Sequence, residues 1–193
     1  MTTFYDGFGN KFNNLDNTNF SNNNLEGKKW LSIGDSITTM TGTYRDMLKN
    51  VYGLTEVSAG KGYNNGWQVG YSQGKNYCIL EKINSLNADI PDIITIALGT
   101  NDYGNNCPIG ELNDGLYNPD NYSFIGCYQN LIQKLYEKFP KVPILLMTPF
   151  PRANGNSVNT TNLILADYAD AIKKVGKYYS IEVCDLTNAC VFL

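Results

Sequence analysis

Three short polar segments carry the residues that could do chemistry in this chain of 193 residues. Residues 34–36 read Gly-Asp-Ser, residues 57–63 read Val-Ser-Ala-Gly-Lys-Gly-Tyr, and residues 98–102 read Leu-Gly-Thr-Asn-Asp. A serine hydroxyl can attack a carbonyl carbon, and backbone amides with a neutral side-chain amide can stabilise the oxyanion that then develops. The residue types therefore fit nucleophilic attack on a carbonyl group if the fold brings the three segments together.

Ser36 follows a short apolar run and precedes a segment with helical spacing. Its hydroxyl is then expected to be exposed at a sheet edge, and its backbone amide to lie at the positive end of a helix, where it can stabilise an oxyanion. The same pattern is typical of an ordinary Asp or Ser helix N-cap. This segment alone does not separate the two interpretations.

The other two segments are open to similar alternatives. Gly60 and Gly62 follow the second apolar run, where a glycine lets the backbone approach a ligand, although glycines also commonly end strands. Asn101 is a neutral donor suited to an oxyanion, whereas residues 99–102 could equally form a polar turn.

Short apolar runs alternate with longer amphipathic segments along the chain, which indicates βαβ units and a parallel sheet. The predicted strands are residues 30–33, 54–59, 93–98, 142–147 and 181–186. The predicted helices are residues 37–50, 75–87, 123–138 and 160–176. Right-handed crossovers favour a doubly wound sheet of order 2-1-3-4-5, with the ligand site outside the carboxyl ends of the strands.

The length and composition predict one domain, over residues 28–193. Residues 1–27 are rich in Asn and form an N-terminal arm or linker, whose aromatic side chains are expected to pack on the domain or on a neighbouring subunit. A homo-oligomer, or a place within a larger polypeptide or assembly, is therefore expected.

Charge and hydropathy exclude several classes of partner. The net charge of −3 lacks the basic excess that a nucleic-acid partner needs. No apolar run reaches about 18 residues, and the polar opening has no secretory h-region, so the chain is expected to be soluble, without a membrane partner, in the cytoplasm or on a virion or cell surface.

Five cysteines, without a CxxC pair or any histidine, make a zinc site improbable and predict free thiols. Cys78 and Cys184 lie in apolar stretches and are expected to be buried. Cys107 and Cys127 flank a loop and could pair in an oxidising setting.

Taken together, residues 34–36 and 99–102 resemble the SGNH (GDSL-type) hydrolases over residues 28–186. The family pattern joins a GDS block, a glycine after the second strand, a GxND block and a late DxxH block. The resemblance implies a three-layer, flavodoxin-like α/β fold, no metal or cofactor, and Ser36 as nucleophile. It implies the Ser36 amide, Gly62 and Asn101 as oxyanion donors; Gly62 is preferred to Gly60 because it lies three residues after Ala59. The supporting positions are Gly34, Asp35, Gly60, Gly99 and Asp102.

The late DxxH block has no counterpart in this sequence, which contains no histidine. Asp185 resembles the strand-end aspartate that precedes that block, so it is not assigned to the triad. A serine without its base is expected to be nearly inert, and a solvated Asp35 or Asp102 near pKa 4 is poorly matched as a substitute; Asp102 is expected to brace its loop. Three explanations stay open: a C-terminally incomplete piece of a longer enzyme, a site completed by another chain, or a silent binding or structural domain.

The loops at 60–75 and 103–122 combine aromatic rings with amides, which suit sugar rings better than fatty chains. The favoured substrate is a surface polysaccharide carrying O-acetyl esters, and small-molecule esters are also expected. Residues 26–30, which lead into the GDS block, also resemble SGNH domains of bacteriophage tails and bacterial surface enzymes. Residues 149–152 are expected at the cleft rim, where Arg152 is either solvated or in contact with an anionic sugar.

Overall fold

The computed structural model of the protein describes residues 25–57, 69–70, 78–112 and 123–189. The predictions made for the N-terminal arm up to residue 24, for Gly60 and Gly62, and for Cys190 lie outside these residues.

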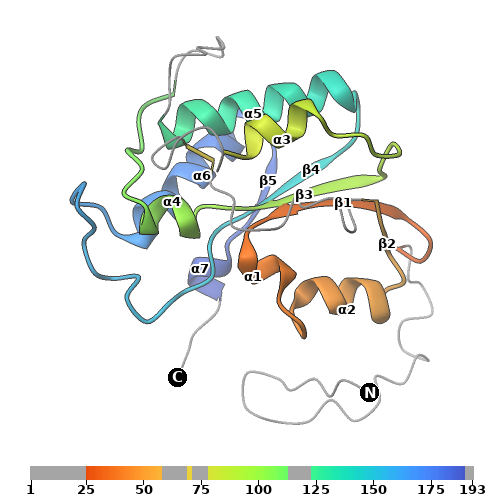
Figure 1. The fold of residues 1–193 in the computed structure, drawn as a ribbon, viewed down its shortest axis with the longest axis horizontal. Coiled ribbons are helices and arrows are strands. Elements are labelled where there is room, and N and C mark those ends of the chain that lie inside the picture. The colour runs from red at the N-terminus through yellow and green to blue at the C-terminus, as the bar shows by residue number, and fades with distance from the viewer. Residues whose placement is uncertain (1–24, 58–68, 71–77, 113–122, 190–193) are drawn as a thin grey trace.

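Five parallel strands form one sheet of order β2-β1-β3-β4-β5, which confirms the predicted topology (Figure 1). The strands are β1 Lys29–Gly34, β2 Thr55–Glu56, β3 Ile93–Ala97, β4 Ile144–Met147 and β5 Glu182–Cys184. Strand β5 is shorter than predicted, because Asp185 leaves the sheet and Leu186 begins a helix. The pairing of β1 with β3 is the longest, running from Trp30 opposite Ile93 to Gly34 opposite Ala97.

The helices alternate with the strands and cover both faces of the sheet. They are α1 Ser36–Thr39, α2 Tyr44–Asn50, α3 Ile79–Asn84, α4 Thr100–Gly104, α5 Phe124–Lys138, α6 Leu165–Tyr179 and α7 Leu186–Ala189. Helices α3, α5 and α6 lie on one side of the sheet, and α1, α2 and α7 on the other, so the architecture has the three layers that were expected (Figure 1).

The single helix predicted over 37–50 is in fact two, separated by a tight turn. Gly42 has a φ of +81°, a left-handed conformation that ends helical geometry and that favours glycine. Its amide donates to Asp46 Oδ2 over 2.6 Å, and Thr43 takes the N-cap position of α2. The predicted start at 160 is also wrong: Asn159 Oδ1 accepts from the amides of Thr161 and Leu163, which holds a turn there and delays α6.

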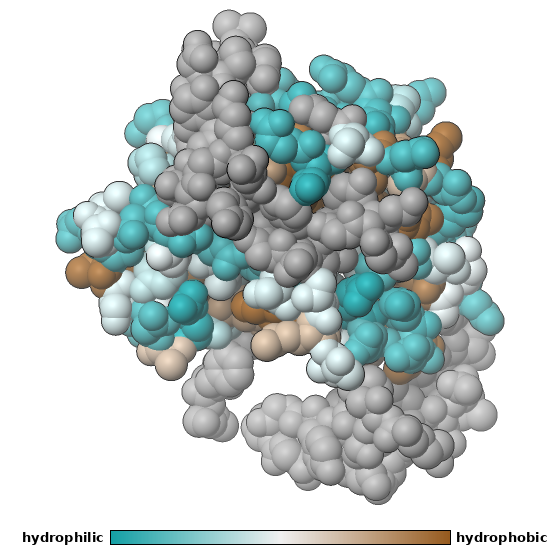
Figure 2. Space-filling model, viewed as in Figure 1, coloured by the Kyte–Doolittle hydropathy of each residue, from teal (hydrophilic) through white to brown (hydrophobic). Residues whose placement is uncertain are grey.

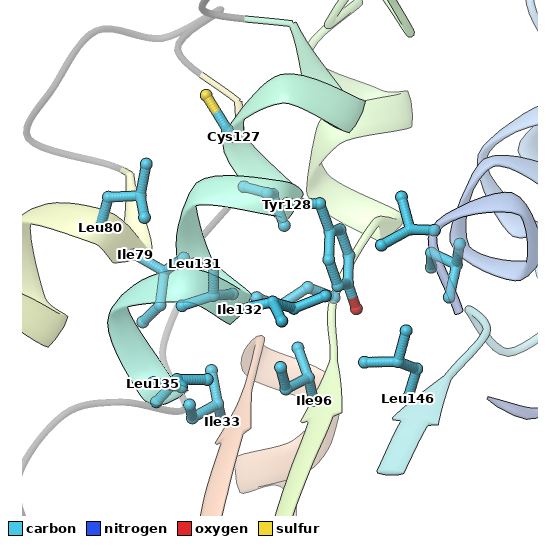
Figure 3. Packing of buried hydrophobic residues seen from close by; sticks show 14 of the residues in the cluster. Ile33, Ile79, Leu80, Ile96, Cys127, Tyr128, Leu131, Ile132, Leu135 and Leu146 are labelled. Carbon is cyan, nitrogen blue, oxygen red and sulfur yellow. The ribbon is translucent and has the colours of Figure 1, made fainter. Parts of the chain in front are cut away.

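The main core lies between the sheet and the layer of α3, α5 and α6. Figure 3 shows Ile33, Ile96 and Leu146 of three neighbouring strands facing the apolar side of α5. All three are fully buried, as are Leu131 and Ile132 of the helix. Burying an aliphatic side chain of this size contributes about 2 kcal/mol, so this packing fixes the sheet on which the site is built.

On the opposite face, a buried ion pair fastens α2 to the edge strand. Arg45 Nη2 lies 2.6 Å from Glu56 Oε2 and Arg45 Nε lies 2.9 Å from Glu56 Oε1, while the Glu56 side chain is fully buried. Lys49 Nζ is more distant, at 3.9 Å. A bidentate pair of this kind orients the helix that follows the Ser36 turn.

We predict that Arg45→Met destabilises the protein by about 3 kcal/mol, because it removes the bidentate cationic partner of the buried Glu56 carboxylate. Urea denaturation monitored by circular dichroism measures the loss. Lys174→Met is the matched control: it breaks an exposed ion pair with Glu111 and should change the free energy of unfolding very little. Equal effects of the two substitutions would contradict the structural role of the buried pair.

Candidate functional site

The loops that leave β1, β3 and β4 meet at the carboxyl edge of the sheet. The register sets Gly34 opposite Ala97, and Ala97 opposite Met147, so the three loops begin at the same level. They enclose a narrow cleft of about 10 Å³, the room of roughly one water molecule. Its lining residues are Asp35, Ile37, Thr38, Ala97, Leu98, Thr100, Thr148, Pro149 and Phe150.

The sequence left open whether Ser36 caps a helix or presents a free nucleophile, and the structure gives the capping to Asp35. Asp35 is the N-cap of α1, and its Oδ1 accepts from the Ile37 amide over 2.9 Å. Ser36 is the first residue of the helix and is exposed, and no described residue forms a hydrogen bond with its hydroxyl. Because Asp35 does the capping, the Ser36 hydroxyl is available to a substrate.

Helix α1 has only four residues, so the expectation that Ser36 lies at the end of a long helix is wrong. A macrodipole needs several aligned peptides, and one turn supplies little of it. Any stabilisation of an oxyanion here must come from individual N–H groups at short range.

Close packing requires the glycines at two positions, one in the GDS block and one in the GxND block. A side chain at Gly34 would place its Cβ 2.2 Å from Thr38 Oγ1, which leaves no room for one. Gly99 has a φ of +123°, and a Cβ there would meet Pro149 Cγ at 3.0 Å. These glycines let the loops after β1 and β3 pack tightly against their neighbours.

Asn101 lies in the first turn of α4, so residues 100–104 form a short helix rather than the polar turn considered from sequence. Gly99 is its N-cap, and the Tyr103 amide donates to the Gly99 carbonyl over 3.0 Å. Asn101 is partly exposed. It therefore stands on a rigid element that begins directly after the strand beside that of Ser36.

Asp102 is fully buried and binds a segment distant from its own loop. Its carboxylate accepts from the Val69 amide over 2.9 Å and from the Gly70 amide over 2.8 Å. Asp102 thus joins α4 to the segment that follows β2. The sequence had predicted only that it braces its own loop. Sequence reasoning missed Val69 and Gly70, because a backbone donor leaves no signal in the residue type.

The expectation that Asp35 and Asp102 are solvated carboxylates near pKa 4 is also wrong. Burial raises the pKa of Asp102 to about 7, against the lowering effect of the Gly70 and Val69 amides. Burial likewise raises the pKa of Asp35 to about 6, although the Ile37 amide stabilises its charged form. Neither carboxylate forms a hydrogen bond with the Ser36 hydroxyl, so neither is placed to take its proton.

Asp185 serves the framework at the end of β5. It accepts from Thr148 Oγ1 over 3.1 Å and lies 2.9 Å from Lys173 Nζ. Burial would raise its pKa, but the bonds from Lys173, Asn188 and Thr148 outweigh burial and hold the pKa at about 2. These contacts join the end of β5 to α6 and to the loop after β4.

Of the aromatic and amide residues that predicted sugar binding in the loops at 60–75 and 103–122, the described ones are Tyr103, Asn105 and Asn106, and the first and last of these hold the loop after β4. The Tyr103 hydroxyl donates to the carbonyls of Asn154 and Ser157, and Asn106 Oδ1 accepts from the Thr160 amide. Asn105 stands at the C-cap of α4. The other members lie outside the described residues: Tyr63, Asn64, Asn65, Trp67, Gln68, Tyr71, Tyr117, Asn118 and Tyr122.

The remaining predictions concern the cleft rim and the thiols. Pro149 and Phe150 line the cleft, whereas Arg152 is exposed, lies over the Tyr103 ring at 5.5 Å and donates to Asn154. Cys107 and Cys127 are buried free thiols, and Cys184 is only half-buried, so the pairing of the first two and the full burial of Cys184 do not occur.

Two further properties concern only the part of the chain that the structure describes. No helix among these residues is long and apolar enough to cross a membrane. Within the same ranges, no group of three or more His, Cys, Asp or Glu side chains is arranged to hold a metal ion.

Comparison with known proteins supplies an independent view of this arrangement. Residues 32–191 match the model of the GDSL-like Lipase/Acylhydrolase family. No protein with curated annotation matches the sequence.

Several solved structures share the fold. A possible lipase from Chitinophaga pinensis has a TM-score of 0.67 and 25% identity, over 83% of this chain and 68% of that one. A protein from Lactobacillus plantarum has a TM-score of 0.69 and 23% identity, over 87% of this chain and 82% of that one. An acetyl xylan esterase has a TM-score of 0.52 and 20% identity, over 83% of this chain and 78% of that one.

The two raised pKa values predict how stability depends on pH. Because the pKa of Asp35 and Asp102 is higher in the folded protein than in the unfolded chain, the folded state binds more protons between about pH 4 and pH 7. The free energy of unfolding should therefore fall as the pH rises through this window, with Asp102 contributing about 1 kcal/mol between pH 6 and pH 7.

Asp102→Asn should remove most of the decline between pH 6 and pH 7, as measured by urea denaturation in buffers of equal ionic strength. Asp170→Asn makes the same change of charge on the exposed side of α6 and should leave the decline in place. An unchanged slope in Asp102→Asn would show that Asp102 does not titrate in this range.

Proposed function

Since this chain belongs to the GDSL-like lipase/acylhydrolase family, we propose that it is a serine ester hydrolase of the SGNH type with Ser36 as its nucleophile. One observation carries the assignment: Asp35 caps α1, which leaves an exposed serine hydroxyl at the carboxyl edge of the sheet, beside the loop that bears Asn101. A serine that served only as a cap would not be in this position.

In the proposed reaction, Ser36 Oγ attacks the ester carbonyl carbon, and a base takes the hydroxyl proton. The Ser36 amide, Asn101 Nδ2 and the Gly62 amide donate to the oxyanion that forms. Collapse of this intermediate expels the alcohol, which receives the proton, and leaves an acyl group on Ser36. A water molecule, activated by the same base, then releases the acid and restores the serine.

The proposed base is a histidine that is not among these 193 residues. We propose that it comes either from a longer form of the polypeptide or from another chain. The buried carboxyls Asp35 and Asp102 do not replace it, because both accept backbone amides and neither contacts the Ser36 hydroxyl. An Asp-x-x-His sequence within about 40 residues downstream of Leu193 in the reading frame would support the first source.

For the substrate we propose an O-acetyl ester on a surface polysaccharide. The support is the abundance of Tyr and Asn in the loops at 60–75 and 103–122, since aromatic faces beside amides suit sugar rings. The similar acetyl xylan esterase is an example of this fold with such an activity.

The alternative function is a catalytically silent glycan-binding or structural domain of a phage tail or surface assembly. The complete absence of histidine from the sequence favours it. Such a domain would use the same loops to hold a glycan without turning it over.

We predict that the 193-residue chain hydrolyses p-nitrophenyl acetate only slowly, since a serine enzyme without its base keeps about 10³–10⁴-fold acceleration over water at most. Added imidazole should supply the missing base and raise the rate in a saturable manner. Ser36→Ala, the control for direct hydrolysis by imidazole, should show no saturable component. Equal rates for the two proteins at all imidazole concentrations would contradict the assignment of Ser36.

An ester hydrolase that acts on polysaccharides and a silent glycan-binding domain should behave differently with acetylated glycans. If the chain is an ester hydrolase, acetate release in the presence of imidazole should disappear with Ser36→Ala. Binding of the glycan that is unchanged by Ser36→Ala, with no acetate released from either protein, would instead support the silent domain. Acetate release is measured enzymatically and binding by calorimetry.

A further inference from the structure

Arg152 is an exposed cation in the loop that follows β4, next to the helix that bears Asn101. Its guanidinium lies over the Tyr103 ring, 5.5 Å from the ring centroid, and its Nε donates to Asn154 Oδ1 over 2.7 Å. A guanidinium fixed by a ring and by a bond at Nε has little freedom left to lose when it binds a ligand. The structure therefore orients this side chain before any ligand arrives.

The outer edge of this guanidinium has no partner among the residues that the structure describes. None of them accepts a hydrogen bond from Arg152 Nη1 or Nη2, and none of their carboxylates forms an ion pair with Arg152. The N–H groups on these two nitrogens form a planar fork that matches the two oxygens of a carboxylate. A carboxylate is therefore the ligand that this edge of the side chain fits.

Helix α4 places the fork near the proposed oxyanion site. A side chain at Gly104, the last residue of α4, would set its Cβ 3.8 Å from Arg152 Nη1. Asn101 lies less than one helical turn before Gly104, so the guanidinium is within about 10 Å of Asn101. The two side chains can then contact one sugar unit, or two linked units, of the same glycan.

The loops around the fork carry no exposed anion that would compete with a ligand. Residues 149–164 contain Arg152 as their single charged residue, and the single charged residue of 98–110, Asp102, is fully buried. The surface over the loop after β4 is mostly hydrophilic, at the lower left of Figure 2. Because the whole chain has a net charge of −3, an anion would be attracted by this local charge and not by the protein as a whole.

We propose that Arg152 binds a carboxylate of the polysaccharide, and so selects O-acetyl esters on acidic sugars over those on neutral sugars. This inference rests on the proposed function for the acetylated glycan, and it adds the charge of the sugar. A carboxylate held by both Nη groups would also fix the direction in which the sugar lies relative to Ser36. Arg152 is thus a residue that determines specificity and takes no part in the bond-breaking steps.

The test compares two ligands that differ at one carbon: an O-acetylated methyl glucuronide, which bears a carboxylate there, and the same acetylated methyl glucoside, which bears a hydroxymethyl group. Both are titrated into the full chain with Ser36→Ala, so that neither is hydrolysed, while the Arg152 Nε–H signal is followed by NMR. We expect the glucuronide to shift this signal and to bind about five-fold more tightly than the glucoside at low salt. Added salt should reduce the preference, because exposed charges are screened.

Arg152→Gln removes the charge, so it should lower the affinity for the glucuronide to that for the glucoside and leave the affinity for the glucoside unchanged. Arg152→Lys keeps the charge but loses the planar fork, so it should retain only part of the preference. Lys138→Gln is the matched control, because it makes the same change of charge at the exposed end of α5, where the chain turns toward the start of β4. It should keep the full preference.

Equal affinity for the two ligands, or no binding of the glucuronide, would overturn the proposal. An equal loss of both ligands in Arg152→Gln would also overturn it, by showing that Arg152 only holds the loop after β4. A preference for the glucuronide that depends on Arg152, in a chain without Ser36-dependent acetate release, would contradict the proposed hydrolase and leave this inference standing. Ser36-dependent hydrolysis of both esters at equal rates would do the reverse.

Discussion

The pairing of β1 with β3 is the constraint on which the site depends. Their register brings Gly34 opposite Ala97, so the loops that carry Ser36 and Asn101 leave the sheet side by side. The two strands are far apart in the sequence, since Trp30 and Thr95 are separated by 65 positions. A hydrogen bond from Trp30 Nε1 to Thr95 Oγ1, buried and 2.9 Å long, reinforces this alignment. A slip by one residue would turn every side chain of β1 to the other face and separate Ser36 from its neighbours.

Around this edge, the protein buries carboxyl groups that do no evident chemistry. Asp35 uses its carboxylate to begin α1, and Asp102 uses its own to hold the amides of Val69 and Gly70. Both are held with a raised pKa, which costs stability near neutral pH. That cost accompanies a precise backbone arrangement around Ser36, and strain or electrostatic cost of this kind is often concentrated at functional sites.

The sequence sufficed for the strand order and for the position of Ser36, because apolar runs and the GDS and GxND blocks are local signals. It failed where a single tertiary contact decides the outcome. The break at Gly42 depends on Asp46, and the burial of Asp102 depends on backbone donors at Val69 and Gly70. The apolar hollow lined by Met47 and Phe150 was likewise hidden, since these two residues are far apart in sequence and line one hollow only in the folded protein.

The proposed function depends most on Ser36 acting as a nucleophile in an oxyanion-stabilising site, although its base is not among these 193 residues. Peptide mapping by mass spectrometry after incubation with an organophosphate ester and imidazole, which supplies the missing base, tests it most directly, because phosphorylation of serine requires the same attack and the same donors. We expect label on Ser36 in preference to the exposed Ser157 and Ser180, with a large loss of label in Asn101→Ala. Equal labelling of all three serines, unaffected by Asn101→Ala, would contradict it.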